Sequence, residues 1–391
     1  MAKKVILAYS GGLDTSVAVK WLKDKGYTVV AYMSNVGQEV NVSKIAKRAK
    51  AAGAAKFIYH DLKKEFVKDF VWPTLKAGAV YEDKYYLATA LSRPLIAKGL
   101  VETAHKEKAH FVAHGCTGKG NDQVRFEVTI NILDPKLKVI APVREWELPT
   151  RDAEIRYAKM HGIPLEVTKK SPYSIDENVW GTSIECGVLE DPWKEPPEGA
   201  YRMTAPPAKW PKKAEEVKIN FLKGIPVGIN GKRYDGLALI DKLNKIGGKH
   251  GIGRTDLVEN RLIGIKSREI YEAPAATILH EAQKDLESLV MDRELLHFKR
   301  SVSAKYAELV YNGLWYTPLK KVLDKLFDAT QSRITGEVRV KLYKGRAVSV
   351  GRKSANSLYK KELATYGAGD IFDQSLAKGF IELWGLPYRK N

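Results

Sequence analysis

The chain has 391 residues, of which 44% are apolar and 28% charged, a balance typical of a soluble globular protein. Its length predicts roughly two or three domains. The two cysteines, Cys116 and Cys186, form neither a CxxC pair nor a zinc-binding spacing, which argues against a disulfide framework and against a structural zinc site.

Hydropathy argues against a membrane protein. No stretch approaches the about 18 uncharged apolar residues of a membrane-spanning helix. The apolar run after Lys3 and Lys4 is short and ends in a Gly-Gly turn, so it does not fit a signal peptide. We therefore expect a cytoplasmic protein with no membrane partner.

The chain is strongly basic, with 65 Lys and Arg against 46 Asp and Glu and a net charge of +19. Such a charge favours anionic partners, nucleic acid included. The lysines are spread along the chain, however, and no RNA- or DNA-binding motif accompanies them. We interpret the charge as a solvated surface suited to anionic substrates, and we expect no nucleic-acid partner.

The first third of the chain alternates strand and helix signals. Short apolar runs predict strands at 5–9, 27–33, 56–59 and 110–114. Helical patterns are predicted at 15–23, 42–52, 65–72 (up to Pro73) and 85–105, the last with a kink at Pro94. This alternation predicts an α/β fold, a parallel twisted sheet with helices on both faces. Ligands bind at the carboxyl ends of such strands, where the Gly11-Gly12 turn and the loop after His114 lie.

The remainder of the chain has a different pattern. Six prolines between Pro192 and Pro211 predict a connection without packed elements. After it, strands are predicted at 216–221 and 227–229, helices at 276–289 and 294–311, and a hairpin formed by 338–343 and 347–350. We therefore expect a second domain of the α+β class.

An apolar stripe ends the chain, and its steps of four and three residues match one helix face. The stripe consists of Phe372, Leu376, Phe380, Ile381 and Trp384. The pattern leaves two interpretations open: the helix docks on its own subunit, or it binds a neighbouring one.

The strongest motif is the run Ser10-Gly11-Gly12-Leu13-Asp14-Thr15-Ser16 directly after the first predicted strand. Glycines let the backbone turn tightly, the hydroxyls offer donors, and the free N–H groups of a helix start favour an anion. These features predict a phosphate cradle. The run matches neither the Walker A loop nor the dinucleotide GxGxxG pattern. The simpler interpretation is a turn in which Ser or Asp only caps the helix.

The run resembles the PP-motif of the N-type ATP pyrophosphatases, whose fold is that of the adenine nucleotide alpha hydrolases. This resemblance implies cleavage of ATP between its α and β phosphates, with adenylylation of a substrate and release of pyrophosphate. The superfamily includes GMP synthetase, NAD synthetase, asparagine synthetase and tRNA-thiolating enzymes, and the motif alone does not choose among them.

A second segment, from His114 to Phe126, combines three glycines with polar and charged side chains where a strand is predicted to end. It closely resembles a signature of the argininosuccinate synthase family. Further segments match that family in order: 81–85, 174–178, 251–254, 258–261 and 266–272. The resemblance covers residues 3 to 360 and implies a nucleotide-binding domain at 1–168, a synthetase domain at 169–362 and an oligomerisation arm at 363–391.

Site roles follow from the resemblance. The nucleotide is expected to contact Ala8, Tyr9, Ser10, Gly11, Gly12, Leu13, Asp14, Thr15, Ser16, Ser34 and Gly115. Aspartate is expected to contact Thr117, Asn121 and Asp122. Citrulline is expected to contact Tyr85, Ala90, Asn121, Arg125, Ser174, Ser183, Glu259 and Tyr271. Asp14, Asp122 and Arg125 are expected to act in the chemistry.

The residue types agree with these roles, since carboxylates suit an ammonium group and Arg suits a carboxylate. Each residue also has a structural interpretation: Tyr85 as a core aromatic, Ser174 as a helix cap, Glu259 as a partner of Arg254 or Arg261. Ala90 departs from the family, in which many members have serine there, and only its backbone N–H is left to bind citrulline.

The implied activity is ATP-dependent condensation of L-citrulline with L-aspartate through citrullyl-AMP. MgATP is expected as co-substrate, with no tightly bound cofactor and no metal ligands assigned in the chain. A homotetramer is implied. The rival function is a tRNA-modifying ATP pyrophosphatase, favoured by the charge but not by the placement of Cys116 and Cys186. A non-catalytic nucleotide- or RNA-binding protein on the same fold is the second rival.

Overall fold

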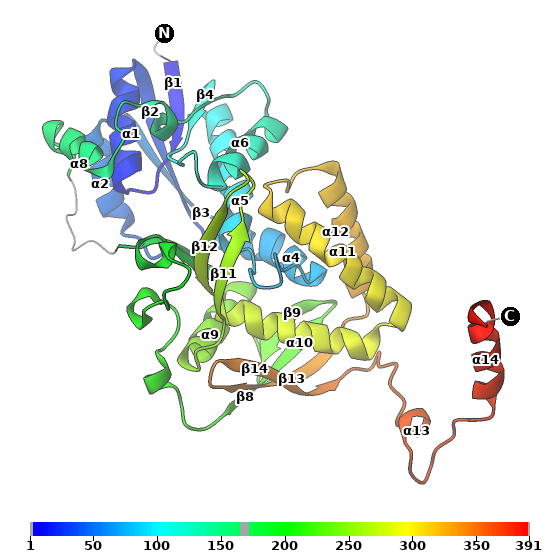
Figure 1. Cartoon of the computed structure of the whole chain (residues 1–391). Coiled ribbons are helices and arrows are strands. Elements are labelled where there is room, and N and C mark those ends of the chain that lie inside the picture. The colour runs from blue at the N-terminus through cyan, green and yellow to red at the C-terminus, as the bar shows by residue number, and fades with distance from the viewer. Residues whose placement is uncertain (1–2, 165–171, 390–391) are drawn as a thin grey trace.

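The computed structural model describes residues 3–164 and 172–389 (Figure 1). The first half contains a parallel sheet with the strand order β3-β2-β1-β4-β5. Its strands are β1 (Lys3–Ala8), β2 (Tyr27–Asn35), β3 (Lys56–Asp61), β4 (Phe111–Ala113) and β5 (Lys138–Ile140). The predicted α/β architecture is confirmed, and the predicted strands are found within two residues of their expected ends.

Both faces of this sheet are covered, as alternate side chains of β1 show. Val5 and Leu7 pack toward one set of helices, and Ile6 packs toward the other. The first set is α1 (Leu13–Asp24), α2 (Val42–Ala52) and α8 (Arg151–Met160). The second set is α5 (Ala88–Lys106) and α6 (Asp122–Leu133). Since both faces are buried, the strand is apolar without alternation from Val5 to Ala8.

The helix predicted to stop before Pro73 does not stop there, and this prediction was wrong. The segment runs through α3 (Lys63–Phe66) and a π-helical turn, η1 (Val67–Val71), into α4 (Trp72–Ala77). Pro73 lies in the first turn of α4, where a backbone N–H needs no partner within the helix. The change of hydrogen-bond pattern at η1 therefore admits the proline.

The second half contains two antiparallel sheets. One has the order β11-β12-β7-β6 and the other the order β10-β9-β8-β13-β14. The first is built from β6 (Ser174–Asn178), β7 (Gly181–Glu185), β11 (Arg254–Asn260) and β12 (Lys266–Glu272). The second is built from β8 (Glu215–Leu222), β9 (Ile225–Ile229), β10 (Lys232–Arg233), β13 (Gly336–Tyr343) and β14 (Arg346–Lys353). The strands predicted at 216–221 and 227–229 and the predicted hairpin are confirmed. The proline-rich connection, which the structure describes in full, contains no strand and no α-helix, but it is not free of packed elements, because it forms two short 3-10 helices and buries Ala200.

Four long helices belong to this half; the first two pack against the sheets, and the last two pack on each other and on α4. They are α9 (Gly236–Lys249), α10 (Pro274–Val290), α11 (Arg293–Tyr311) and α12 (Pro318–Gln331). The predicted helices correspond to α10 and α11, whereas α9 and α12 were not predicted. Short segments complete the fold: α7 (Pro142–Glu145), η2 (Gly187–Glu190), η3 (Glu198–Ala200) and η4 (Pro207–Lys209).

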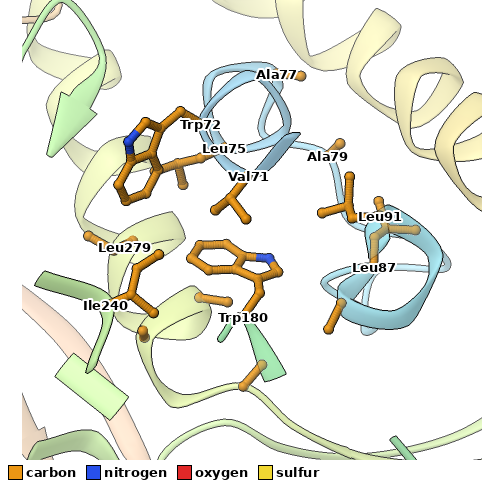
Figure 2. Packing of buried hydrophobic residues seen from close by; sticks show 14 of the residues in the cluster. Val71, Trp72, Leu75, Ala77, Ala79, Leu87, Leu91, Trp180, Ile240 and Leu279 are labelled. Atoms are coloured by element: carbon orange, nitrogen blue, oxygen red, sulfur yellow. The ribbon is translucent and has the colours of Figure 1, made fainter. Parts of the chain in front are cut away.

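One core connects the two halves, and Trp180 lies at its centre (Figure 2). The Trp180 side chain is fully buried between residues of α4 and α5 on one side and of α9 and α10 on the other. Its indole Nε1 donates to the carbonyl oxygen of Tyr86 at 3.0 Å, and its ring meets Trp72 edge-on. An indole of this size removes a large apolar area from water while its one donor stays satisfied. The halves therefore pack as one body.

The chain ends in an arm that leaves this body (Figure 1). It carries α13 (Lys361–Ala364), α14 (Leu376–Gly385) and the short η5 (Leu386–Tyr388). The predicted stripe lies along the arm with every member more than half exposed: Phe372, Leu376, Phe380, Ile381 and Trp384. Docking on its own subunit is thus not seen. Within 3–164 and 172–389, no helix is long and apolar enough to span a bilayer.

Candidate active site

A cavity of about 660 Å³ opens where the parallel sheet meets the sheet of β6, β7, β11 and β12. At the parallel sheet it is lined by residues at the carboxyl ends of β1, β2 and β4, where ligands of such sheets bind. Most of the residues predicted from sequence line it: Ala8, Tyr9, Ser10, Thr15, Ser34, Tyr85, Gly115, Asn121, Asp122, Arg125, Ser174, Ser183, Glu259 and Tyr271. Chain segments far apart in sequence thus converge on one space.

A smaller cavity of about 280 Å³ lies beside the loop between β1 and α1. Gly12, Leu13 and Asp14 line it, and Ser10, Thr15 and Gly115 border both cavities. Arg151 at the start of α8 also lines it, a residue not singled out from the sequence. This cation faces the predicted phosphate loop.

The remaining predicted residues line neither cavity. Gly11 has a φ of +79°, and a Cβ there would lie 3.0 Å from Ile45. The hydroxyl of Ser16 is within 3.0 Å of the Tyr9 hydroxyl and donates to the Gly12 carbonyl at 2.7 Å. Ala90 is buried, and Thr117 is exposed on the loop before α6. Gly11 and Ser16 therefore shape the loop from behind.

The β1–α1 loop is held in shape by its own hydroxyls. The Ser10 Oγ accepts from the Gly12 N–H at 3.3 Å and lies 3.1 Å from the Thr15 Oγ1. Gly12 caps α1 without a side chain, so the N–H groups of the first turn are left for a ligand. At Gly115, a Cβ would lie 3.0 Å from Thr15, so glycine lets the β4 loop pack closely here. The arrangement is that of an anion cradle.

The far end of the main cavity is a network of tyrosines and carboxylates. The Tyr311 hydroxyl donates to Glu259 at 2.7 Å and accepts from the Asn121 amide at 2.8 Å. Tyr271 donates its hydroxyl to Glu259, and its ring stacks on Tyr85 with centroids 4.1 Å apart. Glu259 is almost fully buried, so this end of the cavity presents a desolvated carboxylate.

Tyr85 anchors this network to the start of α5. Its hydroxyl accepts from the backbone N–H groups of Thr89 at 3.0 Å and of Ala90 at 3.1 Å. The Thr89 hydroxyl lies 2.9 Å from that of Ser183 on β7. The Ala90 N–H was expected from the sequence to bind citrulline. In this structure it donates to the Tyr85 hydroxyl.

Two arginines hold Asp122 in the wall of the cavity. Arg125 contacts one carboxylate oxygen at 2.9 Å and Arg93 contacts the other at 2.8 Å, while Arg93 also pairs with Asp176. Burial by itself would raise the pKa of Asp122, but the two arginines outweigh it and hold the pKa below its ordinary value. Asp122 is therefore an anion at neutral pH.

Cys116 lines the cavity but is not suited to nucleophilic chemistry. Burial raises the pKa of its thiol to about 12, and the nearby Asp122 acts in the same direction. A thiol rather than a thiolate is present at neutral pH, and the thiol is the unreactive form. The interpretation of Cys116 as a packing residue is consistent with this chemistry.

Arg93, Tyr311, Arg151 and Glu269 line or border the site but were not assigned from the sequence. Glu269 belongs to the matched segment 266–272, which could have pointed to it. Arg93 lies one turn after Ala90 on α5, and this spacing was the only local signal for it. Tyr311 ends a helix distant in sequence from every motif, so no local pattern could find it.

A parallel α/β domain with an anion cradle, joined to a polar cavity with room for a nucleotide and an amino acid, is the arrangement expected of an ATP-dependent synthetase of the PP-loop class. The model of the arginosuccinate synthase N-terminal HUP domain matches residues 4–164, and that of the arginosuccinate synthase C-terminal domain matches 173–391. The chain belongs to the argininosuccinate synthase family.

Relatives agree over almost the entire length. The argininosuccinate synthase of Chlorobium phaeobacteroides strain BS1 is 56% identical over 385 residues, covering 98% of this chain and 96% of the relative. That of Carboxydothermus hydrogenoformans is 56% identical over 390 residues, covering 100% and 97%. Similarity this high extends to both halves that line the cavity.

Proposed function

We propose that the two cavities form one active site, in which the β1–α1 loop holds ATP and the tyrosine–carboxylate end holds citrulline. Membership in the family makes the chain a carbon–nitrogen ligase that joins L-citrulline to L-aspartate with cleavage of ATP to AMP and pyrophosphate. The observation that carries the site proposal is that the phosphate loop and Glu259 line the same cavity.

The reaction needs two displacements. In the first, the ureido oxygen of citrulline attacks the α-phosphorus of ATP, the bond to the bridging oxygen breaks, and pyrophosphate leaves. In the second, the amine of aspartate attacks the ureido carbon of citrullyl-AMP, AMP leaves, and the nitrogen loses a proton. Positioning and charge stabilisation do most of the work in such phosphoryl transfers. The hydroxyls of Ser10 and Thr15 and the first turn of α1 would stabilise the departing pyrophosphate.

The substrate roles proposed for individual residues follow the matched motifs. ATP is held by residues 8–16 with Ser34 and Gly115, and aspartate by Thr117, Asn121 and Asp122. Asp122, kept ionised by Arg93 and Arg125, suits the ammonium group of aspartate before it reacts. Citrulline is held by Tyr85, Ala90, Asn121, Arg125, Ser174, Ser183, Glu259 and Tyr271.

Mg²⁺ is proposed to enter with ATP. Over 3–164 and 172–389 no group of three or more His, Cys, Asp or Glu side chains could hold a metal by itself. A site with few protein ligands fits Mg²⁺, because proteins often bind this ion through one or two carboxylates together with substrate phosphates. Asp14, which lines the smaller cavity beside the phosphate loop, would hold it. When bound, the ion would neutralise charge on the phosphates.

We further propose a cytoplasmic homotetramer held together in part by the C-terminal arm. The exposed stripe of the arm is a surface that a neighbouring subunit would cover. The proposed domains are 1–168, 169–362 and 363–391; the boundary at 168/169 lies outside the described residues. A tRNA-modifying activity is not favoured, because both halves match argininosuccinate synthase.

The experiment that tests the reaction is pyrophosphate release from MgATP with citrulline or aspartate omitted in turn. We expect release to require citrulline, and AMP and argininosuccinate to accumulate once aspartate is added. ADP as the nucleotide product would contradict cleavage between the α and β phosphates. Release that added RNA stimulates and citrulline does not would favour the tRNA-modifying rival.

A further inference from the structure

Glu269 on β12 lines the citrulline end of the cavity and has no role so far. Its side chain is only 14% exposed. One carboxyl oxygen, Oε2, lies 3.1 Å from the Tyr271 hydroxyl, and the other, Oε1, accepts from Arg261 at 2.9 Å. Glu269 and Glu259 thus approach the same tyrosine hydroxyl from two strands.

The Tyr271 hydroxyl has one hydrogen to donate, but it lies beside two carboxyl groups. Burial, with Glu269 and Glu259 nearby, raises the pKa of Tyr271 well above its ordinary value, so the hydroxyl stays un-ionised. A single O–H can donate to one carboxylate only. The contact to the other carboxyl is a hydrogen bond only if that carboxyl carries the proton and the tyrosine oxygen accepts.

The hydrogen-bond geometry indicates which of the two carboxyl groups carries the proton. Glu259 accepts from Tyr271 on one oxygen and from Tyr311 on the other, an arrangement that stabilises a carboxylate. Glu269 needs only one accepting oxygen, Oε1 toward Arg261, which leaves Oε2 free to donate. Burial, and then Glu259 and Glu185, raise the pKa of Glu269 to about 8 although Arg261 opposes them.

The charged groups around Glu269 do not balance one another when no ligand is bound. Arg261, in the turn after β11, pairs with both Glu185 of β7 and Glu269. Glu259 of β11 adds a third carboxyl, and the second guanidinium that acts on it, that of Arg125, is already paired with Asp122. Two desolvated carboxylates this close favour uptake of a proton or of another cation. The ring of Tyr85 on α5 stacks on Tyr271 and confines the space in front.

We infer that Glu269 and Glu259 together form the binding site for the α-ammonium group of citrulline, and that Glu269 gives up its proton when the ammonium binds. The ammonium takes the place of the proton, so the net charge of the cluster is unchanged. The inference rests on the proposed function, in which citrulline occupies the end of the cavity lined by Glu259, Tyr271 and Ser183. Glu269 is a specificity residue here, because it selects for an amino group on the substrate.

A defined pH dependence follows. Citrulline has to displace a proton below the pKa of Glu269 but not above it. Its KM is therefore expected to rise by up to about tenfold per pH unit as the pH falls below 8, and to level off above it. The KM for ATP is not expected to change in this way, since the phosphate loop lies at the other end of the cavity.

Glu269→Gln tests this inference because glutamine resembles the protonated acid: it can donate to Tyr271 and accept from Arg261. We expect the variant to have a citrulline KM at least about tenfold above wild type at pH 9 and nearly independent of pH down to 6.5, with kcat and the ATP KM little changed. A citrulline KM that keeps its wild-type pH profile in Glu269→Gln would overturn the inference. Glu281→Gln on α10, away from the cavity, is the matched control.

Calorimetric titration of citrulline in buffers of different ionisation enthalpy gives a second readout. Wild type at pH 7 is expected to release close to one proton, and Glu269→Gln none. The probe 5-ureidopentanoate, which lacks the α-ammonium, is expected to release none from wild type. Absence of citrulline-dependent pyrophosphate release by wild type would instead refute the proposed function. Equal proton release by wild type and variant would refute only the role of Glu269.

Discussion

Tyr311 contributes to the site with both its ring and its hydroxyl. The ring stacks on Tyr81 with centroids 3.6 Å apart, and the guanidinium of Arg125 lies over it, 4.8 Å from its centroid. The hydroxyl connects Asn121, which is expected to contact both substrates, to Glu259. A single hydroxyl therefore connects a residue of the predicted aspartate subsite to one of the predicted citrulline subsite.

Tyr311→Phe removes only the hydroxyl and leaves the ring contacts in place. Glu259 then loses one of its two tyrosine donors, and Asn121 loses its acceptor, so we expect the citrulline KM to rise by about tenfold, as for one lost hydrogen bond to a charged group. Steady-state kinetics with each substrate varied in turn measure this.

Tyr306→Phe is the matched control for Tyr311→Phe. It lies on the same helix, α11, but its hydroxyl donates to Asp324 at 2.8 Å on α12. We expect it to lower thermal stability without changing the citrulline KM. Equal citrulline KM values for the two variants would show that the Tyr311 hydroxyl acts only through stability.

Residues in contiguous motifs could be predicted from the sequence, and residues that reach the site through tertiary packing could not. Ser10 and Thr15 follow a strand and precede a helix, so local rules place them at a ligand. Arg93 meets Asp176 across 83 positions in the chain, and Tyr311 meets Glu259 across 52. The first pairing depends on how α5 packs against β6, and the second on how α11 packs against β11. No periodicity in the sequence indicates either packing.

At the scale of elements, polar residues directed into the site disrupt the apolar periodicity from which helices and strands are predicted. The predicted strand at 110–114 and helix at 42–52 have apolar spacing and glycine ends, and both are confirmed. The helix α6 was not predicted, since it buries Gln123 and Arg125 beside Phe126 and loses its amphipathic pattern. The strand β12 directs Glu269 toward the cavity, so the usual alternation of apolar and polar residues fails there.

The end of α11 shows how an element positions a side chain. The helix stops at Tyr311, and Gly313 follows with a φ of +74°. A Cβ at Gly313 would lie 2.7 Å from the Arg125 Cα, closer than real Cβ contacts. The Arg125 Nε donates to the Tyr311 carbonyl at 2.8 Å in the same region. Glycine is required here both for its backbone angle and for close approach.

Gly313→Ala is therefore expected to displace the backbone of α6 at Arg125, to raise the citrulline KM severalfold and to lower the thermal midpoint. Gly264→Ala separates the two causes, because Gly264 also has a positive φ, +86°, but nothing lies within 4 Å of the Cβ it would gain. That control should show only the strain of the backbone, about 1 kcal/mol. Enzyme kinetics and thermal unfolding on both variants measure the difference, and equal losses would refute the steric argument.

At the scale of the whole molecule, the cavity exists because one core fixes the two halves together. Trp180 packs against residues of α4 and α5 from the first half and of α9 and α10 from the second (Figure 2). The class of each half could be predicted from the order of its elements. Their relative placement could not, since it depends on buried side chains from both, and only the family resemblance anticipated a shared site.

The arm exposes an apolar surface that its own chain does not cover. The proposal that a neighbouring subunit covers it can be tested by measuring the oligomeric state. Phe380 and Trp384 stack on each other with centroids 5.7 Å apart, yet both are more than 60% exposed. Monomeric proteins seldom expose an apolar face of this kind. We expect the full chain to have a mass near four times 43.7 kDa by light scattering, and a chain that ends before Gly369 to have a smaller assembly mass.

Phe380→Ser combined with Trp384→Ser tests the same surface at full length, and it should reduce the assembly as the truncation does. Because every residue that lines the cavity lies between Ala8 and Tyr271, both variants should keep citrulline-dependent pyrophosphate release. An unchanged tetramer mass in both variants would mean that other surfaces hold the subunits together. Loss of activity with an unchanged mass would mean that the arm instead supports the fold of its own chain.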